Sequence, residues 1–143
     1  MSISLGIMAG IIFFTYSLYF SRIIKGNPQE FEMDILKALG GWVIVRGMAS
    51  RRSLWMLLYV SLFIEILYFG FTMLVIDNLA MQFITGLAVG LEIFHMVYMG
   101  RNLSRFFKGA IALKEIFSWR LERISALLFF THSFLVLVFL ITY

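Results

Sequence analysis

Four titratable side chains lie inside long apolar stretches of the sequence, namely Glu65, Glu92, His95 and His132. A charge at the centre of a bilayer costs ~2.5–3.5 kcal/mol on insertion scales, so such residues usually serve a function and face a partner inside a helix bundle. A carboxyl group in a low dielectric, beside an imidazole that changes its charge near neutral pH, can relay a proton. These residue types therefore predict a pathway for protons or cations.

The neighbours of Glu65 favour an inward placement. Polar residues recur at helical spacing in this stretch, and they are Ser61, Glu65, Tyr68 and Thr72. Residues at i, i+4 and i+7 lie on one face of a helix. We therefore expect Ser61, Tyr68 and Thr72 to support Glu65 on a polar stripe that faces the bundle interior.

The next apolar stretch carries a second such face, made of Glu92 and His95 with two methionines at positions 96 and 99. Gly86 and Gly90 fall nearly opposite, where small residues allow helices in lipid to approach closely. One side of this helix should pack tightly while the other presents polar groups.

The depth of each side chain follows from its distance to the nearest basic residues, at about 1.5 Å per residue of helix. Glu92 and His132 fall at a similar depth, with His95 nearer the basic edge and Glu65 deeper. This count predicts a Glu92–His132 pair between two helices.

Two alternatives for these side chains remain open. Glu92-x-x-His95 has the Glu-x-x-His spacing of di-iron bundles, although those use two such motifs and two further carboxylates, and His95 with His132 are possible haem ligands. We expect no cofactor, with a metal or haem as the alternative. In the second alternative, the same groups hydrogen-bond between helices to fix the geometry of a non-catalytic assembly or scaffold subunit.

The composition sets the elements that must position these residues. Of 143 residues, 62% are apolar and 14% charged, whereas a soluble domain has about 45–50% and about 25%. A helix needs ~20 apolar residues to cross a bilayer. Four stretches have that length, and they are residues 1–21, 54–76, 78–100 and 124–143. The sequence thus predicts an all-α, polytopic integral membrane protein whose four transmembrane helices form a single domain over residues 1–143.

The basic residues predict the orientation of these helices. All twelve Lys and Arg residues lie within residues 22–52 and 101–123, and short cytoplasmic loops accumulate such residues. Both termini, and the turn at Asp77, should therefore be non-cytoplasmic. We expect a bacterial-type inner or cell membrane rather than an organelle.

Several of the basic residues flank the apolar stretches directly, and these are Arg22, Lys25, Arg101, Arg105 and Lys108. Anionic lipid headgroups are their expected counterions, and a cytosolic protein partner is the alternative. Nucleic acid is not expected, because no recognition motif is present. Four helices leave little room for a path through one copy, so we expect a homo-oligomer or a subunit of a larger membrane complex.

The sequence also contains internally repeated patterns. The pattern Gly-x-x-x-Gly-x-x-x-Phe occurs at residues 6–14 and 86–94, and Ser-Arg-x-x-Lys-Gly occurs at 21–26 and 104–109. These matches predict two tandem repeated hairpins, residues 1–76 and 77–143, as in some transporters.

Both basic connections are amphipathic. In the first, Asn27 and Pro28 predict a helix start, and the helix should stop at Gly40-Gly41. In the second, apolar residues recur at helical spacing from Phe106 to Phe117. We expect two amphipathic helices on the cytoplasmic membrane surface.

Known catalytic motifs are missing from the sequence. It holds no cysteine and no P-loop, G-x-S-x-G, H-E-x-x-H or dinucleotide-binding pattern. The sequence therefore favours a small membrane protein that moves protons or cations over an enzyme.

Overall fold

The computed structural model describes residues 1–142, and this part of the chain is helical throughout apart from its connections. Its elements are α1 (Ser2–Lys25), α2 (Pro28–Arg46), α3 (Ala49–Val75), α4 (Leu79–Phe107), the 3-10 turn η1 (Leu113–Glu115) and α5 (Trp119–Thr142). Helices α1, α3, α4 and α5 are each long and apolar enough to cross a membrane. The predicted all-α class and the four membrane-compatible helices are confirmed, and they indicate a membrane protein.

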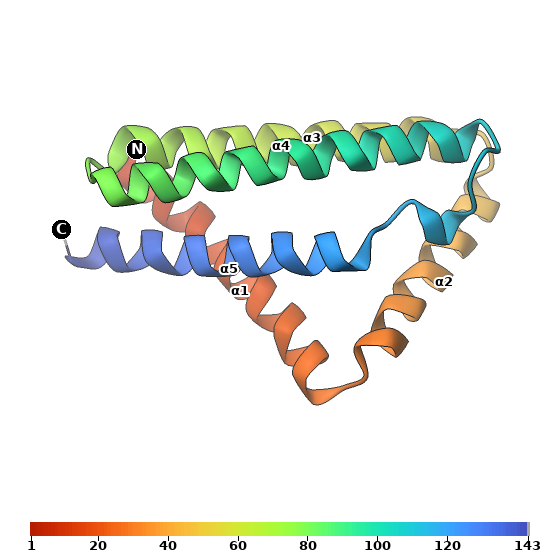
Figure 1. The fold of residues 1–143 in the computed structure, drawn as a ribbon, viewed down its shortest axis with the longest axis horizontal. Helices are drawn as coiled ribbons and strands as arrows, with labels where there is room; N and C mark the ends of the chain where they lie inside the picture. The colour runs from red at the N-terminus through yellow and green to blue at the C-terminus, as the bar shows by residue number, and fades with distance from the viewer. Residues whose placement is uncertain (143) are drawn as a thin grey trace.

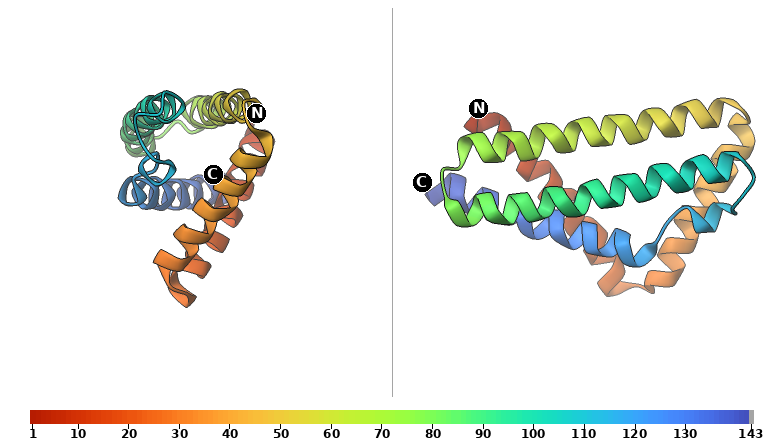
Figure 2. Two further views of the ribbon diagram at one scale, coloured as in Figure 1. Left: turned by 90° about the vertical axis from the view of Figure 1, so that its right-hand side faces the viewer. Right: turned by 45° about the horizontal axis from the view of Figure 1, so that its top comes forward.

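The axes of α3, α4 and α5 are nearly parallel to one another, and that of α1 is oblique to them (Figure 1). Helices α3, α4 and α5 run side by side, and α1 crosses them while α2 returns to the start of α3 (Figure 1). The main packing is α1 on α5, α3 on α4 and α4 on α5. Both termini and the α3–α4 turn lie at one end, the terminal end, and the α2–α3 and α4–α5 connections lie at the opposite, basic end, while the α1–α2 turn projects to one side (Figures 1 and 2).

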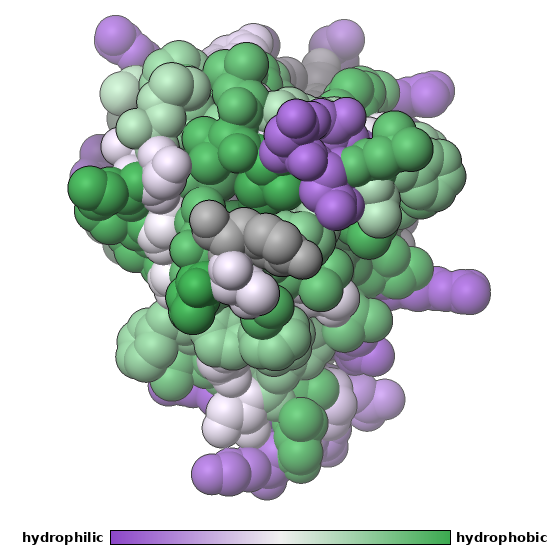
Figure 3. Space-filling model, turned by 90° about the vertical axis from the view of Figure 1, so that its left-hand side faces the viewer, coloured by the Kyte–Doolittle hydropathy of each residue, from purple (hydrophilic) through white to green (hydrophobic). Residues whose placement is uncertain are grey.

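The surface of the bundle is largely apolar, as expected for helices in contact with lipid. Viewed from the terminal end, apolar side chains cover most of the face and hydrophilic ones gather in a few places (Figure 3). Large side chains such as Phe14, Phe63 and Phe83 are exposed, whereas the core around Tyr68 and Phe129 is buried.

Two helix starts follow from local sequence. The Asn27 side chain accepts a hydrogen bond from the Gln29 amide (3.1 Å), and Pro28 occupies the first helical position of α2. The Asn78 side chain accepts one from the Met81 amide (3.1 Å) and starts α4 after a short turn. Asparagine caps satisfy amides that have no partner in the first turn of a helix.

The prediction that α2 stops at Gly40-Gly41 was wrong, because the helix continues to Arg46. Gly40 instead permits a close approach: a Cβ there would lie 3.3 Å from a Leu113 side-chain carbon of the second connection. The helix ends at Gly47, whose φ of +55° favours glycine over other residues.

The second connection does not form the predicted amphipathic helix. Helix α4 ends at Phe107, the chain turns at Gly109 with φ +72°, and the Ala110 amide donates to the Arg105 carbonyl (2.9 Å). The Asn102 side chain then donates to the Ile116 carbonyl (3.2 Å), which holds the connection against α4. Helical spacing of apolar residues was misleading here because the turn at Gly109 interrupts it.

The expected close packing at the glycines of α4 is also absent. Gly86 and Gly90 are exposed, and a Cβ at either position would meet no atom within 4 Å among the described residues. Helix α1 packs mainly on α5 and less extensively on α3.

Candidate functional site

A cavity of about 350 Å³ lies between the helices in the basic half of the bundle. Helix α1 diverges from α3 and α4 toward the basic end (Figure 1), and the cavity is lined by residues from α1 to α5. Its lining combines acidic, hydroxyl and aromatic side chains with methionines, and consists of Tyr16, Tyr19, Ile35, Leu58, Ser61, Glu65, Glu92, His95, Met96, Met99, Phe117, Trp119, Glu122, Ser125, Ala126 and Phe129. Three of the predicted pathway residues thus share one cavity.

The cavity wall holds a hydrogen-bonded trio of Glu92, His95 and Glu122. The Nδ1 atom of His95 lies 3.1 Å from Glu92 Oε2, one turn earlier on α4. Its Nε2 atom lies 2.9 Å from Glu122 Oε1 on α5. The side chains of His95 and Glu92 are 10% and 4% exposed, and that of Glu122 is 22% exposed. The trio therefore leads from a partly open acid at the basic end to a buried one.

The trio carries a net negative charge. An ionised carboxylate only accepts hydrogen bonds, and an imidazole nitrogen donates only when it bears hydrogen. Each of the two nitrogen–oxygen contacts needs one proton. Two carboxylates and an imidazole ring stripped of both N–H hydrogens carry more negative charge than two shared protons can neutralise, so the trio is negatively charged in total. A trio of this kind attracts cations and passes protons along its contacts.

The second oxygen of Glu92 is also engaged. Ser125 on α5 donates to Glu92 Oε1 at 2.6 Å. Glu92 is therefore hydrogen-bonded to one residue of its own helix and to one of α5, and its carboxyl group is held in a fixed orientation.

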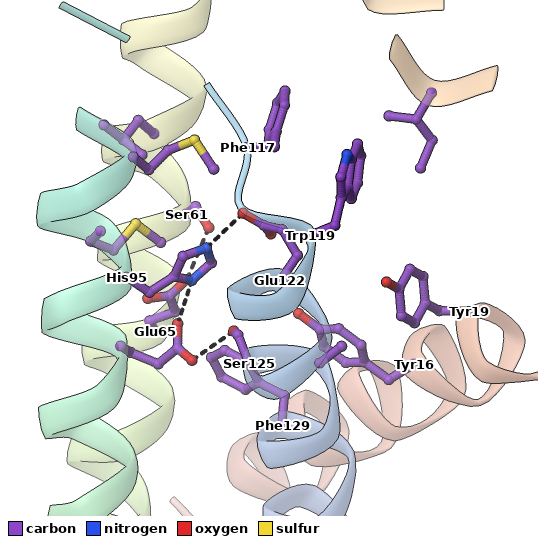
Figure 4. A pocket seen from close by; sticks show the side chains of 16 residues that line it. Tyr16, Tyr19, Ser61, Glu65, His95, Phe117, Trp119, Glu122, Ser125 and Phe129 are labelled. Carbon is purple, nitrogen blue, oxygen red and sulfur yellow. Dashed lines mark hydrogen bonds and ion pairs between the residues drawn. The ribbon is translucent and has the colours of Figure 1, made fainter. Parts of the chain in front are cut away.

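Glu65 faces the same cavity from α3. Ser61 donates to Glu65 Oε1 (3.0 Å), while Oε2 is buried and, within residues 1–142, has no hydrogen-bond partner. Glu65 is close enough to Glu92 and His95 to interact electrostatically. Figure 4 shows Glu65 and His95 on one side of the cavity, facing Glu122 and Ser125, with Tyr16 and Tyr19 beyond them.

His132 lies elsewhere, in a separate buried network. Its Nδ1 atom lies 2.8 Å from the Tyr68 hydroxyl group and its Nε2 atom 2.9 Å from Thr85 Oγ1. Because the Thr85 hydroxyl donates to the Met81 carbonyl (2.7 Å), it accepts from Nε2–H, and Tyr68 donates to Nδ1. His132 is therefore neutral, and both its nitrogens are satisfied.

The predicted Glu92–His132 pair is therefore wrong. Across antiparallel α4 and α5, His95 faces Glu122, Glu92 faces Ser125 and Thr85 faces His132. The depth count started the last span at residue 124, but α5 begins at Trp119 and carries Glu122 and Arg123 within it. The count also ended the preceding span at residue 100, whereas α4 continues to Phe107. In the observed register Ser125, about two helical turns before His132, lies opposite Glu92.

Aromatic rings separate the trio from the His132 network. Phe129 lines the cavity and stacks on Tyr16 with ring centroids 5.7 Å apart and on Phe69 at 5.6 Å. It also contacts the Tyr68 ring, at 6.4 Å. This cluster closes the cavity on the side of the terminal end.

The other members of the predicted polar stripe lie nearer the terminal end than the cavity does. Tyr68 and Thr72 are buried, and the Thr72 hydroxyl donates to the Tyr68 carbonyl (2.9 Å). The stripe of α3 thus contributes Ser61 and Glu65 to the cavity and Tyr68 to the His132 network.

Sequence reasoning missed Glu122 and Ser125. Glu122 stands between Arg120 and Arg123, so it was assigned to a charged connection. A signal was present, since positions 122, 125, 129 and 132 recur at helical spacing and share one face. Extending the last helix backward along that face would have placed Glu122 in the bundle.

An ion pair joins α2 to α5 near the cavity. Arg123 on α5 donates through Nε to Glu32 Oε1 on α2 (2.8 Å), and a second guanidinium nitrogen contacts the same oxygen. Tyr19 of α1 contacts the Phe31 ring of α2 at 5.6 Å. Helix α2 is thereby attached to both α1 and α5.

A metal or haem gains no support from this geometry. Over residues 1–142, no group of three or more His, Cys, Asp or Glu side chains is arranged to hold a metal ion. Each ring nitrogen of His95 and His132 is already within hydrogen-bond distance of a side chain. Haem ligation would have to break these contacts.

The basic residues predicted to face lipid or a partner are all exposed. They lie at the end of α1, toward the end of α4 and just after it, and they are Arg22, Lys25, Arg101, Arg105 and Lys108. Their side chains are free to meet an anionic surface at the basic end.

Comparison with known proteins gives no relative, since no protein-family model, curated protein or solved structure matches the chain. Its function is therefore inferred from the chemistry of the cavity.

Proposed function

We propose that the protein moves protons or cations across a membrane, with the cavity as its central site. The observation that supports this function is the hydrogen-bonded trio of Glu92, His95 and Glu122, which shares a cavity with Glu65 inside a bundle of membrane-compatible helices. Ionisable groups at such positions usually mark ion pathways or proton relays.

A proton enters through Glu122, the more exposed acid of the trio. When Glu122 is protonated and Nδ1 of His95 bears the hydrogen of the other contact, Glu122 passes its proton to Nε2 as Nδ1 passes its own to Glu92, so each contact still holds one proton. Glu65 is the next acceptor in the cavity, since its Oε2 atom has no hydrogen-bond partner within the described chain.

Passage to the terminal end requires the Phe129 cluster to open, because these rings close the cavity on that side. A conformational change of α1 relative to α5, or a second copy of the chain, would provide the opening. We therefore keep the homo-oligomer, or a subunit of a larger membrane complex, as part of the proposal.

His132 takes a structural role in this proposal. Its network ends on the backbone carbonyl of Met81, which cannot pass a proton onward. Tyr68 and Thr85 hold the imidazole neutral and fix α3, α4 and α5 against one another.

The proposed orientation places the basic end in the cytoplasm, against anionic lipid headgroups, and both termini outside, in a bacterial-type inner or cell membrane. The exposed cations at that end support it. The two repeated hairpins remain a proposal that rests on the matching sequence patterns of residues 6–26 and 86–109.

The test is proton flux into liposomes that contain the purified protein, measured with an internal pH dye. Glu92→Gln and Glu122→Gln each keep the size of the side chain and remove the carboxylate, so flux should fall by about 100-fold or more. Glu30→Gln is the matched control, because Glu30 is an exposed acid of α2 outside the cavity. Wild-type flux in both cavity variants would overturn the proposal.

The second candidate is an assembly or scaffold subunit. It is favoured by the same inter-helix contacts, together with the Glu32–Arg123 pair, since these also fix the bundle geometry. In that case function should depend on the basic surface, and charge reversal at Arg105 and Lys108 should release a protein partner. A partner that still co-purifies with this variant would count against the scaffold role.

A further inference from the structure

An apolar groove adjoins the cavity on the outer side of α3 and α4. It has a volume of about 250 Å³, and its apolar wall includes Ile66, Gly70, Met73 and Val89. Glu65 and Glu92 line both the groove and the cavity. The two spaces therefore meet at these carboxyl groups, and the groove leads from them toward the lipid-facing surface.

Aromatic rings also line the cavity, although both faces of Phe129 are covered by its stacking on Tyr16 and on Phe69. Tyr16, Tyr19, Trp119 and Phe129 all line it, on α1 and α5. The face of an aromatic ring attracts cations and is the common means of recognising quaternary ammonium groups. The volume of the cavity lies within the range of small-molecule sites.

The oxygen donors of the cavity favour a large, weakly hydrated cation over a small inorganic one. Calcium requires six or more oxygen ligands, and magnesium near-ideal octahedral geometry. Here both carboxyl oxygens of Glu92 and one of Glu122 are already engaged in hydrogen bonds. Glu65 Oε2 is buried and, within residues 1–142, is left without a partner.

We propose that the transported cation is amphiphilic, with an ammonium head in the cavity beside Glu65 and the aromatic rings, and an aliphatic tail in the groove of α3 and α4. This inference rests on the proposed transport function and names its substrate class. The tail would stay in contact with the bilayer, so the ligand would enter from the side, between α3 and α4.

Binding of two ammonium compounds to the protein in phosphatidylcholine nanodiscs tests this inference. Hexyltrimethylammonium and tetramethylammonium share a head group and differ in the tail. Titration is followed by calorimetry and by the fluorescence of Trp119, which lines the cavity whereas Trp42 and Trp55 do not. Empty nanodiscs correct for partition into lipid. The hexyl compound should bind saturably and at least about tenfold more tightly, because its tail is buried.

Two variants separate the head site from the tail site. Glu65→Gln should weaken the binding of both compounds by roughly tenfold or more, since it removes the charge beside the head group, and exposed Glu30→Gln is its control. Gly70→Leu fills the groove, where a Cβ meets no atom within 4 Å among the described residues, so the chain has room for it. It should bring the affinities of the two compounds close together.

The outcomes distinguish this inference from the proposed function. The inference would be overturned if neither compound bound saturably, or if the wild-type protein bound both with equal affinity. Proton flux that depends on Glu92 would still support transport in that case. Saturable binding that requires Glu65 and Gly70 would support the inference. If such binding occurred in a protein that carries neither protons nor the ammonium compounds across a liposome membrane, it would identify a binding protein for amphiphilic cations and overturn the transport function.

Discussion

Two buried histidines lie on the same pair of antiparallel helices, nearly three turns apart, and their surroundings differ in a way that separates function from structure. His95 contacts two carboxyl groups, Glu92 and Glu122, beside a cavity. His132 contacts two hydroxyl groups, those of Tyr68 and Thr85. The first set is charged and can exchange protons among equivalent positions, whereas the second is neutral and has one arrangement of hydrogens.

The difference shows that burial of a histidine in a membrane bundle does not by itself indicate a proton pathway. What matters is where its hydrogen bonds end. The His132 network ends on the Met81 carbonyl, while the His95 trio ends on a partly exposed acid and opens into a cavity with another acid, Glu65. Only the second arrangement connects to a source of protons or cations.

The largest expected effect compares the two histidines directly. His95→Gln removes the group that exchanges protons between Glu92 and Glu122, so proton flux in liposomes should fall by about 100-fold or more. His132→Gln should lower thermal stability, because a buried network loses its centre, while flux per folded protein stays near the wild-type value. Equal losses of flux in the two variants would remove the distinction between the two regions.

A smaller effect is expected from Tyr68→Phe, which removes the hydroxyl group that donates to His132. Inter-helix hydrogen bonds in membrane proteins contribute ~0.6 kcal/mol on average and ~1.7 at most. The free energy of unfolding should fall within that range, as measured by equilibrium unfolding in mixed micelles. Tyr59→Phe is the control, because Tyr59 is 61% exposed. A Tyr68→Phe protein as stable as the control would show that the network contributes little.

The sequence was sufficient to predict the parts of this comparison that depend on local pattern. The lengths of the four apolar stretches correspond to the four membrane-compatible helices, and the spacing of Glu92 and His95 put both on one helix face. Length and period are properties of a single segment, so they need no knowledge of its neighbours.

The partners across helices were not predictable in the same way. Assigning Ser125 to Glu92, and Glu122 to His95, requires the register of α5 on α4, which depends on where α5 begins. A charged pair of residues at the start of a span resembles a loop in sequence. In the structure both charges have partners on other helices, because Glu122 contacts His95 and Arg123 contacts Glu32.

The smallest expected effect concerns two buried serines of α5 and sharpens the comparison within one helix. Ser125 donates to Glu92 at 2.6 Å, whereas Ser133 donates to the Phe130 carbonyl at 3.0 Å. Ser125→Ala frees one carboxyl oxygen, so Glu92 is held less firmly toward His95, and proton flux should fall by roughly three- to tenfold, the value of one hydrogen bond. Ser133→Ala should leave flux unchanged. Both variants lose one hydroxyl group from a buried position of the same helix, so they are directly comparable. A similar flux in the two would mean that the orientation of Glu92 does not limit proton movement. The trio would then act through its charge alone.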